Sequence, residues 1–147
     1  MSLEADVRRM ARTGPFRLLP REALQLIAFS CTRLTLKAGQ TVFVEGDAAD
    51  AAYFVLAGAV LLIANGVERR VEADGLIGET ALIADVPRRA SARAAEDAVV
   101  LCVPREVFKR VLSEFPRAAA KIRAQALARS RNLLEQLQDV RARGFEG

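Results

Sequence analysis

The sequence contains no histidine and no tryptophan, and only two cysteines among its 147 residues. The lack of histidine excludes a Ser-His or Cys-His nucleophile, a histidine metal ligand and an imidazole base. The two cysteines, Cys31 and Cys102, lie in apolar, strand-like runs without the close pairing of a metal or redox motif. We expect both to be reduced thiols of the core.

Long apolar runs are also missing. No run approaches the roughly 18 residues that a membrane span needs, and the N-terminus, MSLEADVRRM, lacks the apolar core of a signal peptide. We therefore expect a cytoplasmic protein. The formal net charge is +4, but the arginines are spread along the chain instead of forming one basic block. This distribution argues against nucleic-acid binding by this chain alone.

What the sequence does contain is a hydrophobic content of 52%, enough for one domain with a single core. We assign residues 1–147 to that domain. A helical pattern from Met10 to Ser30 is divided by Pro15, which breaks the first piece, and by Pro20, which opens the second. Residues 1–30 are therefore predicted to form N-terminal helices.

The spacing of the apolar residues changes in residues 31–103, where short strand-like runs alternate with turn residues. Asn65-Gly66 is the strongest hairpin signal, because both central positions of that turn need positive φ. Glycines recur at the ends of the runs, at Gly39, Gly46, Gly58 and Gly75. This spacing predicts a small antiparallel barrel or jelly roll.

Residues 104–143 return to a helical pattern. Pro104 opens one helix, Pro116 marks a corner, and Arg117–Arg143 is predicted to be one long helix. The expected fold class is therefore α+β: an antiparallel β-roll with N-terminal helices and two C-terminal helices.

A loop between two strands, GETALIADVPRRAS at residues 78–91, has the composition of an anion site. The start of a short helix at ETALIAD presents free N–H groups that suit a phosphate, and Gly78 lets the backbone approach closely. Arg88 offers a planar guanidinium to two phosphate oxygens. Glu79 accepts hydrogen bonds from hydroxyl groups. The loop therefore predicts a ligand that carries both an anion and a hydroxyl.

This loop and the earlier run GQTVFVEGDAADAAYFVLAGAV resemble the cyclic nucleotide-binding domains, from about Phe16 to Arg131. GETALIADVPRRA is similar to the family's phosphate-binding cassette, Gly-Glu-x-Ala-Leu followed by Pro-Arg-x-Ala. The resemblance implies that Glu79 holds the ribose 2′-hydroxyl and Arg88 the cyclic phosphate. It also implies that N–H groups complete the cradle beside Gly78, near Thr80, Ala81, Arg89 and Ala90.

Arg89 departs from the family, whose members commonly have Ala, Ser or Thr at this position. A Thr there favours guanine, so we expect cAMP to be preferred, with cGMP as the alternative ligand, and no cofactor. Glu79 has no second carboxylate at a suitable spacing and the chain has no metal-ligand set, so we expect no enzyme activity. The alternative for Glu79 and Arg88 is an ion pair that closes the loop.

The last helix carries a heptad-like stripe at Ala126, Ser130, Leu133, Leu137 and Val140. This face either packs on the protein's own barrel or forms the seam of a homodimer. In bacterial channel relatives an arginine on this helix covers the purine, and the resemblance of RAAAKIRAQALARSR to that segment places Arg129 in the same position.

The expected function is a cyclic-nucleotide sensor that transmits binding through its C-terminal helices. One alternative is a degenerate interaction or dimerisation domain that no longer binds nucleotide. Another is the sensor part of a longer protein, because catabolite activator relatives add a helix-turn-helix domain and channel relatives a membrane pore. Neither segment is found within residues 1–147.

Overall fold

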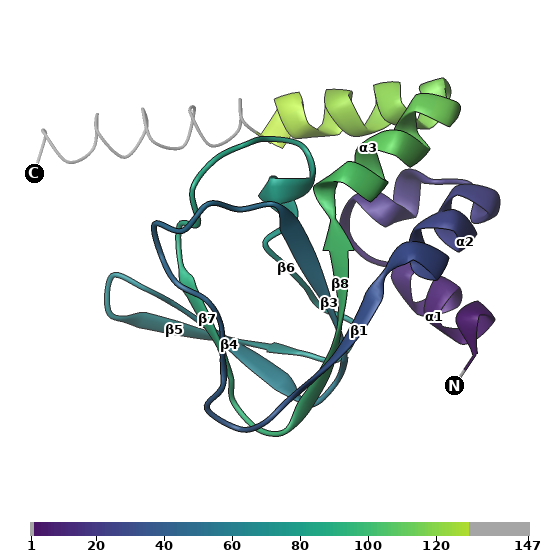
Figure 1. Cartoon of the computed structure of the whole chain (residues 1–147). Coiled ribbons are helices and arrows are strands. Elements are labelled where there is room, and N and C mark those ends of the chain that lie inside the picture. The colour runs from purple at the N-terminus through teal and green to yellow at the C-terminus, as the bar shows by residue number, and fades with distance from the viewer. Residues whose placement is uncertain (1, 130–147) are drawn as a thin grey trace, which may run out of the picture.

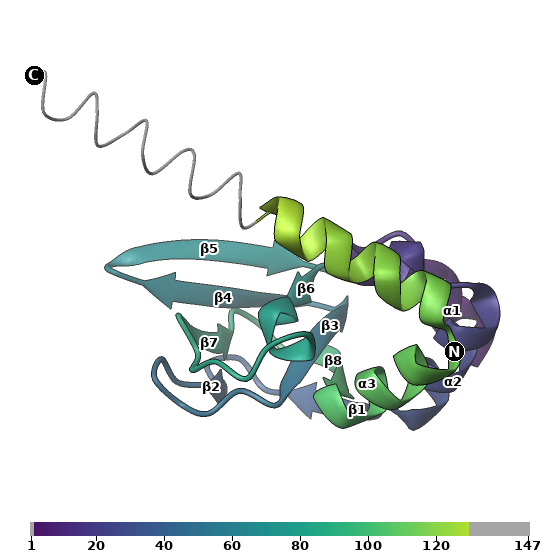
Figure 2. The same ribbon diagram turned by 90° about the horizontal axis from the view of Figure 1, so that it is seen from above.

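The computed structural model describes residues 2–129, which form two antiparallel sheets with helices gathered at one end (Figure 1). Figure 2 shows the helices packed together at this end, with the last helix extending over the sheets. The expected α+β fold with a β-roll is confirmed. Residues 116–129 are helical, and the remainder of the predicted long helix lies outside the described residues.

The first N-terminal helix lies inside residues 1–30 but ahead of the helical pattern that runs from Met10 to Ser30. Helix α1 spans Leu3–Met10, and the Ser2 side chain caps it by accepting a hydrogen bond from the Ala5 N–H. A 3-10 helix, η1, spans Gly14–Leu18, and α2 spans Arg21–Ser30. Pro15 therefore does not break a helix; it lies in the first turn of η1, where its missing N–H costs no hydrogen bond.

The strands form two four-stranded sheets, in the orders β1-β8-β3-β6 and β2-β7-β4-β5. Their bounds are Thr32–Leu36 (β1), Thr41–Phe43 (β2), Ala51–Ala57 (β3), Ala59–Ala64 (β4), Val67–Glu72 (β5), Leu76–Ile77 (β6), Ser91–Ala94 (β7) and Ala98–Pro104 (β8).

The predicted hairpin at Asn65-Gly66 joins β4 to β5, and both residues have positive φ, at 52° and 75°. In the turn after β5, however, Asp74 adopts the left-handed conformation, with φ of 71°, and Gly75 does not. An aspartate tolerates this conformation better than most residues, so the glycine there is not needed for its φ.

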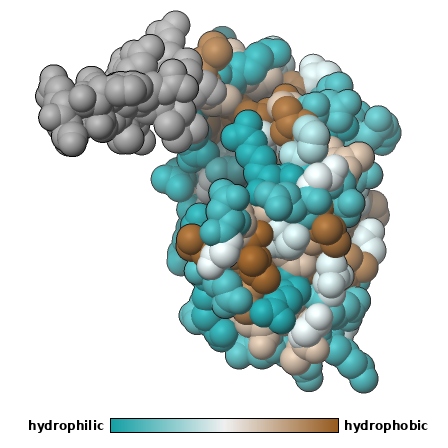
Figure 3. Space-filling view, turned by 90° about the vertical axis from the view of Figure 1, so that its left-hand side faces the viewer, coloured by the Kyte–Doolittle hydropathy of each residue, from teal (hydrophilic) through white to brown (hydrophobic). Residues whose placement is uncertain are grey.

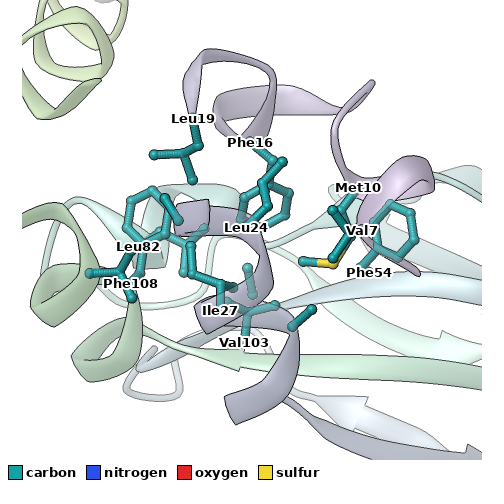
Figure 4. Packing of buried hydrophobic residues seen from close by; sticks show 14 of the residues in the cluster. Val7, Met10, Phe16, Leu19, Leu24, Ile27, Phe54, Leu82, Val103 and Phe108 are labelled. Carbon is teal, nitrogen blue, oxygen red and sulfur yellow. The ribbon is translucent and has the colours of Figure 1, made fainter. Parts of the chain in front are cut away.

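Apolar side chains form two clusters, one inside the roll and one between the roll and the helices. In the second cluster Phe16 and Phe108 meet edge to face, with ring centroids 6.1 Å apart. Phe108 belongs to α3, which spans Arg105–Glu114. Figure 4 shows Leu82 beside Phe108. Because Leu82 follows Glu79 by one turn, this packing fixes the candidate loop to the core.

Both cysteines are free and half-buried. Burial is the main reason that the pKa of Cys31 rises from 9.0 to about 12, and burial also raises the pKa of Cys102. The two thiols therefore stay protonated at neutral pH. None of the helices within residues 2–129 has the length and apolar character needed to cross a lipid bilayer.

Candidate functional site

The candidate loop begins with a sharp change of backbone direction. Gly78 has φ of 71° and precedes a second 3-10 helix, η2, which spans Glu79–Leu82. The predicted helical stretch from Glu79 to Asp85 is thus shorter than expected: the chain leaves the helix after Leu82 enters the core. Among the predicted cradle groups, the N–H of Ala81 donates to the Gly78 carbonyl.

The other three predicted N–H donors belong to Thr80, Arg89 and Ala90. Within the described residues, none of the three donates a hydrogen bond. A main-chain donor next to a cavity is normally paired with protein, water or ligand. These groups are therefore open to a ligand's acceptors.

Arg88 is the main cation of the loop, and only 7% of it is exposed. Its Nη2 donates to the Ala51 carbonyl at 2.8 Å, and the guanidinium carbon lies 4.1 Å from the ring centre of Phe43 and 5.8 Å from that of Tyr53. These contacts hold the guanidinium in place without neutralising its charge.

No carboxylate within residues 2–129 lies at ion-pair distance from Arg88, and its buried Nε has no hydrogen-bond partner there. Burial lowers the pKa of Arg88, although Tyr53 and then Asp50 act in the opposite direction. A buried cation without a counterion is costly to the free protein. The arrangement therefore attracts an anion.

Six of the predicted site residues line one cavity of about 170 Å³: Gly78, Thr80, Ala81, Arg88, Arg89 and Ala90. Val86 and Pro87 of the same loop also line it, and Phe43, Ala49 and Leu62 contribute from outside the loop. Sequence reasoning did not assign these three to a site, because small and apolar side chains in or beside strands carry no signal that separates a cavity wall from core.

The two remaining predicted residues, Glu79 and Arg129, line a second hollow of about 450 Å³, together with Gln125. Thr80 and Arg89 line both hollows, which therefore adjoin. Figure 3 shows the face turned to the left in Figure 1, where apolar patches alternate with hydrophilic side chains.

Glu79 is paired with the last helix and not with Arg88. Arg129 donates from Nη1 to the Glu79 Oε1 at 2.8 Å. The other carboxylate oxygen faces η1, since a Cβ placed on Gly14 would lie 2.8 Å from Oε2. The ion pair between Glu79 and Arg88, considered as an alternative, is thus not formed. The Arg129 contact was not anticipated from the sequence.

Two further predictions concern the heptad-like stripe and Arg89. Of the heptad-like stripe, only Ala126 is described, and it lines the second hollow; Ser130, Leu133, Leu137 and Val140 lie outside the described residues. Arg89 is exposed and has no side-chain partner within residues 2–129. No cluster of three or more acidic or cysteine side chains in that range is placed to hold a metal ion.

The chain is 31% identical over 124 residues to lysophospholipase NTE1 of Chaetomium globosum, a match covering 80% of this chain and 8% of that enzyme. It is 38% identical over 89 residues to the cAMP-dependent protein kinase regulatory subunit of Aspergillus niger, covering 58% of this chain and 22% of the subunit. The chain thus spans less than a quarter of either relative.

A solved structure of a cyclic nucleotide-binding-like protein from Brucella abortus is 34% identical and superposes with a TM-score of 0.68. That match covers 74% of this chain and 98% of the other. Residues 33–115, more than half of the chain, match the family described as the cyclic nucleotide-binding domain. The chain therefore belongs to the cyclic nucleotide-binding domain family.

Proposed function

We propose that this domain binds cAMP in preference to cGMP and acts as a sensor without catalytic activity of its own. The observation that carries the proposal is Arg88, a buried cation with no carboxylate partner among the described residues. A cyclic phosphate supplies one negative charge and acceptor oxygens to this position. Its binding would neutralise a charge that the free protein keeps desolvated.

The phosphate would lie in the 170 Å³ cavity, with Arg88 on one side and the open N–H groups of Thr80, Arg89 and Ala90 around it. Charged and main-chain donors of this kind make strong hydrogen bonds to phosphate oxygens. The ribose would extend toward Glu79, whose carboxylate accepts hydrogen bonds from hydroxyl groups. The base would then occupy the adjoining hollow beside the last helix.

The signal would pass through the contact between Glu79 and Arg129. In the structure Arg129 donates a hydrogen bond to one carboxylate oxygen of Glu79. A ribose hydroxyl competes for the same carboxylate, so ligand binding would release Arg129 from it and let the guanidinium stack on the purine. The helix that begins at residue 116 would thereby be held differently in the free and bound states.

This exchange of partners is tested with two ligands. We expect Arg129→Ala to weaken cAMP binding by about 0.5–2 kcal/mol, the value of a guanidinium stacked on an aromatic ring. Binding of ribose cyclic phosphate, which lacks the base, should be unchanged or slightly tighter, because Glu79 is freed. Glu79→Ala should weaken both ligands by about 1–3 kcal/mol. Isothermal titration calorimetry measures all four affinities.

Arg123→Ala is the matched control, since Arg123 is exposed on the same helix and has no carboxylate partner among the described residues. It should leave both affinities unchanged. Equal losses for the two ligands on Arg129→Ala, or no loss for either, would remove Arg129 from the site.

A further inference from the structure

Arg105, the first residue of α3, ties together two segments that are distant in the sequence. Its Nη1 donates to the carbonyl oxygens of Ala49 at 2.8 Å, Ala81 at 3.2 Å and Ala84 at 3.1 Å. Its main-chain N–H donates to the Asp50 carbonyl at 2.7 Å. One residue thus joins the chain before β3 to the candidate loop and to α3.

Two of the three carbonyl groups held by Arg105 belong to residues that line the 170 Å³ cavity, and the third, that of Ala84, belongs to a residue of the adjoining hollow. Ala49 and Ala81 both line that cavity and are only 4% and 2% exposed. Three carbonyl dipoles directed at one point repel one another unless a cation lies between them. Removing the guanidinium would leave buried acceptors without a donor, which is costly in a protein interior.

The ion pair with Asp85 is a minor part of this arrangement. The Arg105 Nη2 lies 3.7 Å from Asp85 Oδ1, and the Asp85 side chain is 86% exposed. Ion pairs of this geometry and exposure contribute little. The main-chain acceptors, and not the carboxylate, therefore explain why an arginine stands at this position.

We propose that Arg105 is a positioning residue of the nucleotide site: it sets the distance between the loop at 78–90 and the segment before β3, and it joins both to α3. The proposal rests on the proposed binding function. Arg105 itself does not line the 170 Å³ cavity, so it acts through the main chain that carries the cradle. Through Arg105, a change in the position of the loop would also move α3, in addition to the last helix, which carries Arg129.

The test compares Arg105→Gln with two controls in the full chain. Glutamine retains a donor but loses the charge and the reach across three carbonyls. Arg110→Gln makes the same change on an exposed residue of α3 that has no carboxylate partner among the described residues. Asp85→Asn removes only the ion pair. Hydrogen exchange of the ligand-free proteins and calorimetry with cAMP are measured for each.

Arg105→Gln should speed amide exchange in residues 78–90 by about tenfold or more while leaving β4 and β5 unchanged, and should weaken cAMP binding by a similar factor. Both controls should stay within about twofold of the parent protein. Arg105→Lys, which keeps the charge, should recover part of each loss. Parental exchange and affinity in Arg105→Gln would overturn the proposal.

A uniform rise in amide exchange across both sheets would also overturn the proposal, because Arg105 would then stabilise the whole fold and not the loop in particular. If Arg105→Gln does not fold, the same measurement is made on Arg105→Lys. The exchange experiment needs no nucleotide. If the parent protein fails to bind cAMP, the proposed function fails, whereas loop-selective exchange still decides whether Arg105 positions the loop.

Discussion

Replacing Arg88 with methionine is expected to weaken cAMP binding by about 2–5 kcal/mol, because it removes the charged partner of a desolvated phosphate. The free energy of unfolding of the ligand-free protein should stay within about 1 kcal/mol of the parent value or rise. Methionine fills a similar space against Phe43 and Tyr53, and it removes a buried charge that lacks a counterion among the described residues. The lost hydrogen bond to Ala51 opposes this gain.

Urea unfolding and calorimetry measure the two effects separately. Arg89→Met is the control, since the neighbouring arginine is exposed and makes no side-chain contact with a carboxylate in residues 2–129. It should change affinity far less than Arg88→Met. If Arg88→Met instead lowered stability by more than about 2 kcal/mol and left affinity unchanged, Arg88 would be a structural residue.

Gly78→Ala is expected to impair both folding and binding. The left-handed conformation of this residue, with φ of 71°, should cost about 1–2 kcal/mol of unfolding free energy once a Cβ is present. The added Cβ would lie 2.5 Å from the Arg88 Nη1 and must displace the guanidinium. We therefore expect cAMP affinity to fall at least about tenfold, because a small misplacement of a charged donor is costly.

Gly39→Ala separates these two causes. Gly39 has φ of 86°, and a Cβ there would meet nothing within 4 Å. The substitution imposes similar backbone strain away from the cavity, so it should lower stability and leave affinity intact. Equal affinity losses in the two variants would show that strain alone, and not displacement of Arg88, reduces binding.

The fold could be predicted largely because residues typical of turns mark the ends of its strands. Asn65-Gly66 specified a hairpin, and the strand-like runs before and after it became β4, which is apolar, and β5, which is mostly charged. Strands β6 and β7 gave no comparable signal: β6 has two residues, and β7 reads SARA, without a β-branched or aromatic side chain. Their pairing partners fix them, and those partners are distant in the sequence.

The part of the candidate site that lies in one loop could be predicted, because its residues are adjacent in the sequence. The contacts between distant segments could not. Adjacent loop residues predict a ligand that carries both an anion and a hydroxyl. The bond between Glu79 and Arg129 joins residues 50 positions apart, and the rings of Phe43 and Tyr53 reach Arg88 from two different sheets. Such contacts depend on how the roll closes, which no local pattern specifies.

Calorimetric titration of the protein with cAMP and cGMP, supported by a thermal shift, tests the central claim most directly. We predict a micromolar dissociation constant for cAMP, about −8 kcal/mol, and weaker binding of cGMP, because Arg89 stands where a hydroxyl would favour guanine. Titration of both nucleotides to millimolar concentration with neither heat nor thermal shift would contradict the account and would leave a domain of this fold that no longer binds nucleotide.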